Sequence, residues 1–270
     1  MTLRSLSRSL LGPALRLLYT PWVMLAFLLL GLGALVLLVL LPRLPQRRAA
    51  ARQLARAFLL TAGMPVRVHA AQPLPRGQCV VVCNHASYID GIVLTAALPP
   101  RFGFVIKREM AEVPLVGPLL RRLGSHFVER FDRQRSAADA RRVLRTATEG
   151  NSVVFFPEGT FPDRPGLLKF HLGAFVTAVR AGCPLVPAAL RGTRRVLPPR
   201  GLPCPGRIEL QLLAALAPGE AADQHAVPRL RDAARLAVLT ALGEPDLTCS
   251  GGTDRLPDTA PARSAPASRS

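Results

Sequence analysis

The chain has 270 residues, 49% of them hydrophobic and 5% aromatic, and it carries a formal net charge of +18. That length is enough for one sizeable domain with an extension, and the positive charge favours partners that carry phosphate groups, such as anionic lipids, phosphorylated substrates or nucleic acid. The few aromatic residues and the lack of a helix-turn-helix, zinc-finger or base-stacking motif argue against nucleic acid as the partner.

An uncharged apolar segment at residues 21–41 is the first element that the sequence predicts. As a helix it would be about 32 Å long, which matches the hydrocarbon core of a membrane. A soluble helix rarely stays apolar on every face, and no clear cleavage site of a signal peptide follows the segment. We therefore expect a membrane anchor at residues 1–42. The anchor is either a single apolar helix or, because residues 3–19 look amphipathic, a re-entrant helical hairpin within residues 3–41.

Arginines dominate the next stretch, residues 43–72, for which we expect an interfacial helix and a linker. Arg48, Arg52 and Arg56 recur at helical i, i+4 spacing. They could form a solvated helix face or a cationic stripe that binds anionic headgroups, and the adjacent anchor favours the stripe. The excess of arginine after the apolar segment favours an inner or cytoplasmic membrane with the C-terminal domain on the cytoplasmic side.

Short apolar strands alternate with helices over residues 73–244. The predicted strands are residues 79–83, 102–107, 126–129, 152–157, 184–190 and 207–213, and the predicted helices are residues 91–98, 114–123, 136–149, 168–181 and 226–242. This alternation predicts an α/β domain with a largely parallel sheet flanked by helices. Cys79 and Cys83 flank an apolar strand, so we expect buried free thiols there. Residues 245–270 are rich in Pro, Ser, Gly and Ala and are predicted to be a disordered tail.

The stretch CNHASYID, residues 83–90, directly follows the first of these strands. On a straight helix positions i and i+5 lie on different faces, so His85 and Asp90 can meet only if His85 lies in the turn and Asp90 begins the helix. A carboxylate that holds one imidazole nitrogen leaves the other available as a base. A capping Asp beside a structural His is the alternative, and the pair alone does not decide between them.

A second constellation, FPEGT at residues 156–160, ends another predicted strand, and the strand VPAALRG at residues 186–192 follows it. With these segments the chain resembles the glycerolipid acyltransferase family, typified by 1-acylglycerol-3-phosphate acyltransferase. The resemblance covers about residues 75–195. It rests on NHxSxxD at residues 84–90, GSHFVER at 124–130, FPEGT at 156–160, the strand that holds Val186 and Pro187, and a Lys-x-Glu stretch at Lys107 and Glu109.

The resemblance implies transfer of a fatty acyl group from an acyl thioester, acyl-CoA or acyl-carrier protein, to a glycerol hydroxyl. A hydroxyl is a weak nucleophile at neutral pH and needs a base, which the resemblance assigns to His85 with Asp90 as its partner. It assigns positioning of the acceptor to Glu158, Gly159 and Thr160, phosphate binding to Lys107 and Arg130, and supporting roles to Asn84, Ser87, Phe156 and Pro157. We expect no metal site and no cofactor beyond the thioester co-substrate. The expected partners are membrane lysophospholipids and phospholipids.

One position departs from the family pattern, because Phe161 stands where the family commonly has Arg after FPEGT. If that arginine binds the acceptor's phosphate, its role passes to another residue, for which Arg164, Lys169 and His171 are nearby candidates, or the acceptor differs. The expected acceptor is 1-acylglycerol 3-phosphate. Another lysolipid, glycerol 3-phosphate and an aminoacyl lipid remain alternatives.

Two other classes of protein remain as rivals. A lipid hydrolase would use Ser87 with His85 and Asp90, but the chain has no G-x-S-x-G elbow and Ser87 is only two residues from His85. A non-catalytic lipid-binding protein would have no need of an intact His–Asp pair.

Overall fold

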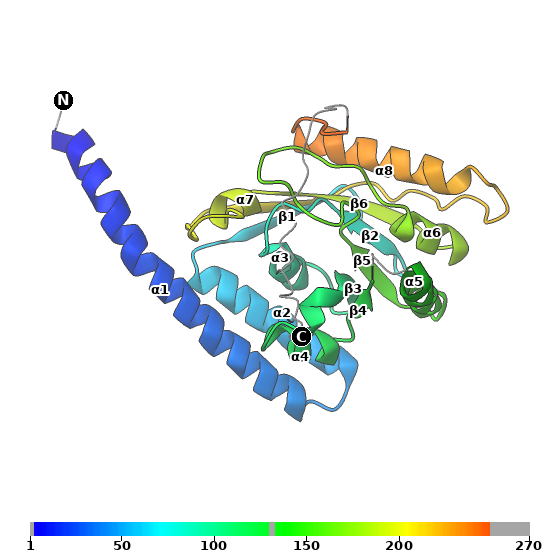
Figure 1. Cartoon of the computed structure of the whole chain (residues 1–270), viewed down its shortest axis with the longest axis horizontal. Coiled ribbons are helices and arrows are strands. Elements are labelled where there is room, and N and C mark those ends of the chain that lie inside the picture. The colour runs from blue at the N-terminus through cyan, green and yellow to red at the C-terminus, as the bar shows by residue number, and fades with distance from the viewer. Residues whose placement is uncertain (1–2, 130–132, 249–270) are drawn as a thin grey trace, which may run out of the picture.

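The structure is a computed structural model that describes residues 3–129 and 133–248. A long helix and a second helix precede the sheet, and the remaining helices alternate with strands (Figure 1). The helices are α1 (Leu3–Leu40), α2 (Leu44–Thr61), α3 (Asp90–Ala97), the 3-10 helix η1 (Arg108–Ala111), α4 (Val116–Arg122), α5 (Arg133–Thr148), α6 (Gly173–Arg180), α7 (Thr193–Val196) and α8 (Ala226–Leu242). The strands are β1 (Val66–Ala70), β2 (Val80–Cys83), β3 (Phe102–Lys107), β4 (His126–Val128), β5 (Ser152–Phe155), β6 (Leu185–Arg191) and β7 (Ile208–Leu212).

The strands form one sheet in the order β1-β7-β6-β2-β5-β3-β4. All neighbouring pairs are parallel except β6 and β7, which are antiparallel. The prediction of a largely parallel α/β sheet is therefore confirmed. Because β2 lies between β5 and β6, the segments that follow these three strands emerge at the same edge of the sheet.

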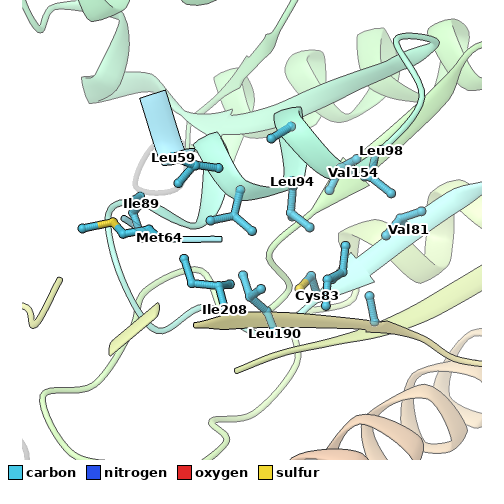
Figure 2. Packing of buried hydrophobic residues seen from close by; sticks show 14 of the residues in the cluster. Leu59, Met64, Val81, Cys83, Ile89, Leu94, Leu98, Val154, Leu190 and Ile208 are labelled. Carbon is cyan, nitrogen blue, oxygen red and sulfur yellow. The ribbon is translucent and has the colours of Figure 1, made fainter. Parts of the chain in front are cut away.

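Helices cover both faces of the sheet, and alternate residues of β2 point into the two layers. Val81 and Cys83 pack with α2 and α3, whereas Val80 and Val82 pack with α6 and α8. Figure 2 shows the first layer, where Leu59, Leu94 and other apolar side chains lie against the strands. Burying a side chain of this size stabilises the fold by roughly 1.5–3 kcal/mol.

Strand β1 lies in a segment that the sequence analysis placed in the linker. Its sequence, VRVHA, alternates apolar and polar residues over only five positions, and its side chains are mostly exposed. The strand pairs along its whole length with β7. The ordered domain therefore begins near residue 65, and the predicted linker within residues 43–72 is corrected to a strand at the edge of the sheet.

Helix α1 is continuous from Leu3 to Leu40 and runs through Pro21, so of the two predicted alternatives the single helix is present and the hairpin within residues 3–41 is wrong. Helix α2 returns beside it (Figure 1). The Tyr19 hydroxyl and the Trp22 indole donate to the carbonyls of Ala62 and Thr61, at 2.6 and 3.2 Å. These bonds fix α1 to the end of α2.

The apolar part of α1, Leu18–Leu40, is long and apolar enough to cross a membrane by length and composition, with a mean hydropathy of 3.0. A few of its side chains, such as Val23, pack into the core. Most of the large ones face outward: Leu18, Trp22, Met24, Leu25, Phe27, Leu28, Leu29, Leu32, Val36, Leu37, Val39 and Leu40. An exposed apolar face of this extent is typical of a surface that meets lipid or another protein.

The arginines of α2 have a different role from the predicted headgroup stripe. Arg48 donates to the carbonyls of Leu123 and Arg101, at 3.0 and 3.1 Å. At the C-terminal end of α3, Arg52 donates to the Ala97 carbonyl at 3.4 Å and Arg56 donates to the Ala96 carbonyl at 2.9 Å. Burial lowers the pKa of Arg48. The stripe therefore faces the domain, where it fixes α2 and satisfies helix-end carbonyls.

The first residues of the predicted tail are ordered. Pro245 and Leu247 exchange backbone hydrogen bonds with Leu167, and Asp246 pairs with Arg235 at 2.6 Å. Residues 249–270 lie outside the described part of the chain. Four of the five cysteines are described, and all four are free thiols. Cys79 and Cys83 are buried as the sequence predicts, and Cys183 is buried as well.

Candidate active site

Polar side chains from three loops meet at the edge where β2, β5 and β6 end. His85 follows β2, and Asp90 is the first residue of α3. Glu158 follows β5, and Arg194 lies in α7 directly after β6. Loops beyond the carboxyl ends of parallel strands are where ligand sites collect in α/β sheets.

His85 and Asp90 form a direct pair. His85 Nδ1 and Asp90 Oδ2 lie 2.7 Å apart, and the same oxygen accepts the backbone N–H groups of Ala86 and Ser87 at 2.7 and 2.9 Å. Asp90 is fully buried. These bonds, together with the N-terminus of α3, stabilise its negative charge. The carboxylate fixes the imidazole so that Nε2, which has no partner among the described residues, is left for a ligand.

Aromatic rings surround the imidazole. Phe156 stacks on His85 with centroids 4.3 Å apart, and Phe161 meets it edge-on at 4.6 Å. Tyr88 packs edge-on against Phe161 at 4.9 Å and is 68% exposed. The rings restrict water around His85, which strengthens its polar interactions with Asp90 and with a ligand.

Glu158, to which the resemblance assigns positioning of the acceptor, is bonded inside the protein. It is only 3% exposed, and its two carboxylate oxygens accept the backbone N–H groups of His85 at 2.7 Å and Leu168 at 2.9 Å. Burial raises the pKa of Glu158 to about 7. Because both oxygens are bonded inside the protein, Glu158 holds the backbone of the candidate base instead of reaching toward an acceptor.

The rest of the FPEGT segment forms a tight turn. The N–H of Gly159 donates to the Phe156 carbonyl at 3.0 Å, and a φ of +77° makes glycine the favoured residue at this position. Pro157 is buried and its carbonyl accepts the N–H of His171. Thr160 is exposed at the end of the turn, so Gly159 and Thr160 are the members of the segment that an acceptor can reach.

Two predicted supporting residues join loops that are distant in sequence. The Asn84 amide donates to the Leu190 carbonyl at 2.9 Å and accepts the Leu190 N–H at 2.7 Å, which ties β2 to β6. Ser87 is fully buried, and its hydroxyl donates to the Leu197 carbonyl at 2.6 Å. This position fits a structural residue and argues against Ser87 as the nucleophile of a hydrolase.

The predicted basic residues that the structure describes lie at the end of β3 and on the segment after FPEGT. Lys107 ends β3 and pairs with Glu109 at 3.0 Å, and β3 is separated from β2 by β5. Arg164, Lys169 and His171 are exposed on the segment after FPEGT. Arg130 lies outside the described residues.

Sequence reasoning missed one basic residue at this edge, Arg194. Its Nη1 donates to the carbonyl of Pro162, which directly follows Phe161. A signal was present, because GTRR follows the strand that holds Val186 and Pro187. A basic residue directly after a strand that belongs to a family block is a candidate ligand for phosphate, and this rule would have identified Arg194.

The arrangement can perform proton transfer from a hydroxyl at the open nitrogen of His85, with Asp90 stabilising the imidazolium that forms. The buried thiol of Cys83 is unsuited to nucleophilic attack, because burial raises its pKa well above the usual value. Within residues 3–129 and 133–248, no group of three His, Cys, Asp or Glu side chains is placed to hold a metal ion.

Comparison with known proteins gave matches to acyltransferases. Residues 65–191 match the family model described as Acyltransferase. The chain is 31% identical over 220 residues to a lyso-ornithine lipid O-acyltransferase from Pseudomonas aeruginosa, covering 78% of this chain and 83% of that protein. It is 34% identical over 188 residues to a 1-acyl-sn-glycerol-3-phosphate acyltransferase from Chlamydomonas reinhardtii, covering 69% of this chain. The chain spans about half the length of the algal relative, 54%.

The crystal structure of the 1-acyl-sn-glycerophosphate acyltransferase from Thermotoga maritima has a similar fold. The TM-score is 0.69 at 20% sequence identity, and the match covers 90% of this chain and 98% of that one. The likeness therefore includes most of the described helices and strands.

Proposed function

The chain belongs to the acyltransferase family, and we propose that it is a membrane-associated O-acyltransferase that moves a fatty acyl group from an acyl thioester to the hydroxyl of a lysophospholipid. The proposed acceptor is 1-acylglycerol 3-phosphate, which would give phosphatidic acid, and the proposed donor is acyl-CoA or acyl-carrier protein. The observation that carries the proposal is the 2.7 Å contact between His85 Nδ1 and the buried carboxylate of Asp90.

The proposed reaction is a direct transfer within a ternary complex. His85 Nε2 removes the proton of the acceptor hydroxyl as the oxygen attacks the thioester carbonyl. The C–S bond of the tetrahedral intermediate then breaks, and the imidazolium returns the proton to the departing thiolate. Asp90 stabilises the imidazolium and holds the ring in position. No acyl-enzyme forms, since the nearby Ser87 and Cys83 are fully buried.

The surrounding residues position the substrates. Glu158 holds the His85 backbone from the loop after β5, and Phe156 supports the imidazole face. Gly159 and Thr160 are proposed to contact the acceptor. Lys107 and Arg130 are proposed to bind phosphate on a substrate, where Arg acts as a bidentate ligand and Lys as a point charge.

The outward apolar face of α1 supports a location at a membrane, where lysolipid acceptors and diacyl products reside. We propose that α1 anchors the enzyme there with the catalytic domain on the cytoplasmic side. The exposed apolar side chains continue to Leu18 and Trp22, beside the end of α2 that leads into β1. The start of β1 lies at the catalytic edge of the sheet. Val66 pairs with Ile208, and the neighbouring Glu209 pairs with Arg191 at the end of β6.

A second candidate acceptor is an aminoacyl lysolipid. The relative from Pseudomonas aeruginosa, which matches over most of its length, is named for such a substrate, and Phe161 replaces the arginine that the family commonly carries. The aromatic cluster of Tyr88 and Phe161 can also contact a cationic headgroup.

An acyl-transfer assay on the full chain in membranes tests the proposed function. Labelled acyl-CoA and acyl-carrier protein are each offered with 1-acylglycerol 3-phosphate, lyso-ornithine lipid and glycerol 3-phosphate. Transfer to 1-acylglycerol 3-phosphate that is lost in His85→Ala supports the proposal. Transfer to lyso-ornithine lipid alone supports the second candidate, and no transfer from either donor to any acceptor contradicts both.

A further inference from the structure

Arg194 reaches the loop after β5, and the segment that follows Arg194 contacts the His85 turn. It is the second residue of α7, which begins after Gly192 at the end of β6. Its Nη1 donates to the Pro162 carbonyl, one residue beyond the Phe161 ring that contacts His85. Three residues further on, the Leu197 carbonyl accepts the hydroxyl of Ser87, which belongs to the His85 turn. Helix α7 therefore lies beside the site, and its Arg194 guanidinium group reaches the loop after β5.

The guanidinium of Arg194 has hydrogen-bonding capacity that the protein does not use. Arginine has five N–H donors, and the described residues provide Arg194 with one acceptor, the Pro162 carbonyl. Its Nε is buried and has no partner in the described part of the chain. A buried donor without an acceptor is costly, so the arrangement favours a ligand that supplies acceptor oxygens and lets the side chain settle around it.

Within residues 3–129 and 133–248, no carboxylate forms a direct ion pair with Arg194. Glu158 lies close enough for Arg194 to lower the pKa of its carboxyl, although burial raises that pKa more. Both Glu158 oxygens accept backbone N–H groups instead, from His85 and Leu168. A cation held partly buried and without a paired carboxylate is typical of a site that binds an anion.

Two other basic residues at this end of the sheet already pair with carboxylates, and position 161 itself is occupied by Phe161, whose ring lies beside His85. Arg200 forms an ion pair with Asp163 at 3.1 Å. Lys107 pairs with Glu109 on the far side of β5. In 1-acylglycerol 3-phosphate the phosphate is attached to the carbon next to the one that carries the reacting hydroxyl. Its ligand must therefore lie beside His85.

We propose that Arg194 binds the phosphate group of the acceptor and thereby selects phosphate-bearing lysolipids over acceptors that lack phosphate. The inference deepens the proposed function, because it names the residue that takes the role of the arginine absent at position 161. Its kinetic part rests on the proposed function. Phosphate binding itself can be measured without turnover, so the two proposals can fail separately.

Binding of glycerol 3-phosphate to the full chain in detergent micelles is the first test, measured by titration calorimetry with glycerol as the phosphate-free probe. Arg194→Gln should weaken the binding of glycerol 3-phosphate about 10- to 100-fold, the usual effect of losing hydrogen bonds to a charged group. Arg194→Lys should weaken it less, because it keeps the charge and loses the fork. The matched control is Arg195→Gln at the exposed neighbour, which should change the affinity less than twofold.

Three results would overturn the inference. The wild-type chain could fail to bind glycerol 3-phosphate, Arg194→Gln could bind it as tightly as the wild type, or Arg195→Gln could weaken it equally. The last result would mean that only the overall charge of this surface matters.

Steady-state kinetics with two acceptors distinguishes a phosphate ligand from a structural arginine. With 1-acylglycerol 3-phosphate, Arg194→Gln should raise KM more than it lowers kcat, and the loss should be smaller with a monoacylglycerol, which has no phosphate for Arg194 to bind. Adding Phe161→Arg to the Arg194→Gln variant should restore part of the preference for the phosphate-bearing acceptor. Equal losses on both acceptors would give Arg194 a structural role. If the enzyme transferred acyl groups only to phosphate-free lysolipids, the proposed acceptor would be wrong. Binding of glycerol 3-phosphate that still depends on Arg194 would then support the anion site by itself.

Discussion

The carboxylate of Glu158 accepts the backbone N–H of His85 at 2.7 Å, across a distance of 73 positions in the sequence. The candidate base is thereby held twice, through its backbone by the loop after β5 and through its side chain by Asp90 at the start of α3. Because the Glu158 carboxyl is buried and its pKa is raised to about 7, the contact also links the site to pH.

Glu158 should make the stability of the protein fall as the pH rises from about 4.5 to 7. In this range the unfolded chain has already lost the proton that the folded chain keeps, so each pH unit costs about 1.4 kcal/mol, and the whole range about 3 kcal/mol. Glu158→Gln cannot ionise and should remove this slope. Urea unfolding of both proteins between pH 4.5 and 8 measures it, and the difference between them isolates Glu158 from other titrating groups. Identical slopes would contradict the prediction.

Substitutions in the His85 turn should distinguish the residues that carry out proton transfer from those that stabilise the turn. His85→Ala should lower kcat by about 10²- to 10⁴-fold or more, the usual contribution of a positioned base, and Asp90→Asn should have nearly as large an effect. Ser87→Ala should lower stability by about 1–3 kcal/mol, because it leaves the Leu197 carbonyl unpaired, while most of the activity remains.

Steady-state kinetics with both substrates varied checks the mechanism behind these substitutions. Intersecting lines are expected for a ternary complex. Ping-pong kinetics, or an acyl group trapped on Ser87 or Cys83, would show that an acyl-enzyme forms. The same data from Ser87→Ala show whether the buried hydroxyl has any part in turnover.

Charges on the outward face of α1 should release the protein from membranes. Leu29 and Leu32 are 59% and 49% exposed, so Leu29→Arg with Leu32→Arg should leave the fold intact and lower binding to phospholipid vesicles more than tenfold. Leu236→Arg on α8 is the matched control, because Leu236 is 64% exposed on the opposite layer of the domain. Vesicle flotation measures the effect. Undiminished binding of the double variant, or equal loss in the control, would show that this face is not the membrane contact.

Arg48 should contribute to stability, not to headgroup binding. Arg48→Ala removes two hydrogen bonds, to the carbonyls of Leu123 and Arg101, and should lower the free energy of unfolding by about 1–3 kcal/mol. Arg67→Ala, at an exposed position of β1, should change it by less than about 0.5 kcal/mol. Chemical unfolding together with vesicle flotation decides the matter. Weaker vesicle binding at unchanged stability would restore the headgroup interpretation of the arginine stripe.

Local features of this protein could be predicted from the sequence, because short-range geometry fixes them. The apolar runs gave the central strands, since a buried parallel strand needs apolar residues on both of its faces. The meeting of His85 and Asp90 was predictable because both lie in one strand-to-helix turn, where the chain itself brings them together. Ordered family blocks then identified the kind of chemistry, while the order of the blocks carried no information about distances between them.

Tertiary structure alone decided the contacts between distant segments. Strand β1 is short and mostly exposed, so its sequence is a weak signal, and its place in the sheet follows from pairing with β7. Arginines on α2 have the same spacing whether they face headgroups or carbonyls, so only the docking of α2 on α3 distinguishes the two. Glu158 reaches His85, and Arg194 reaches Pro162, because β2 lies between β5 and β6. Strand order is set by packing across the whole sheet, which no single segment of the sequence encodes.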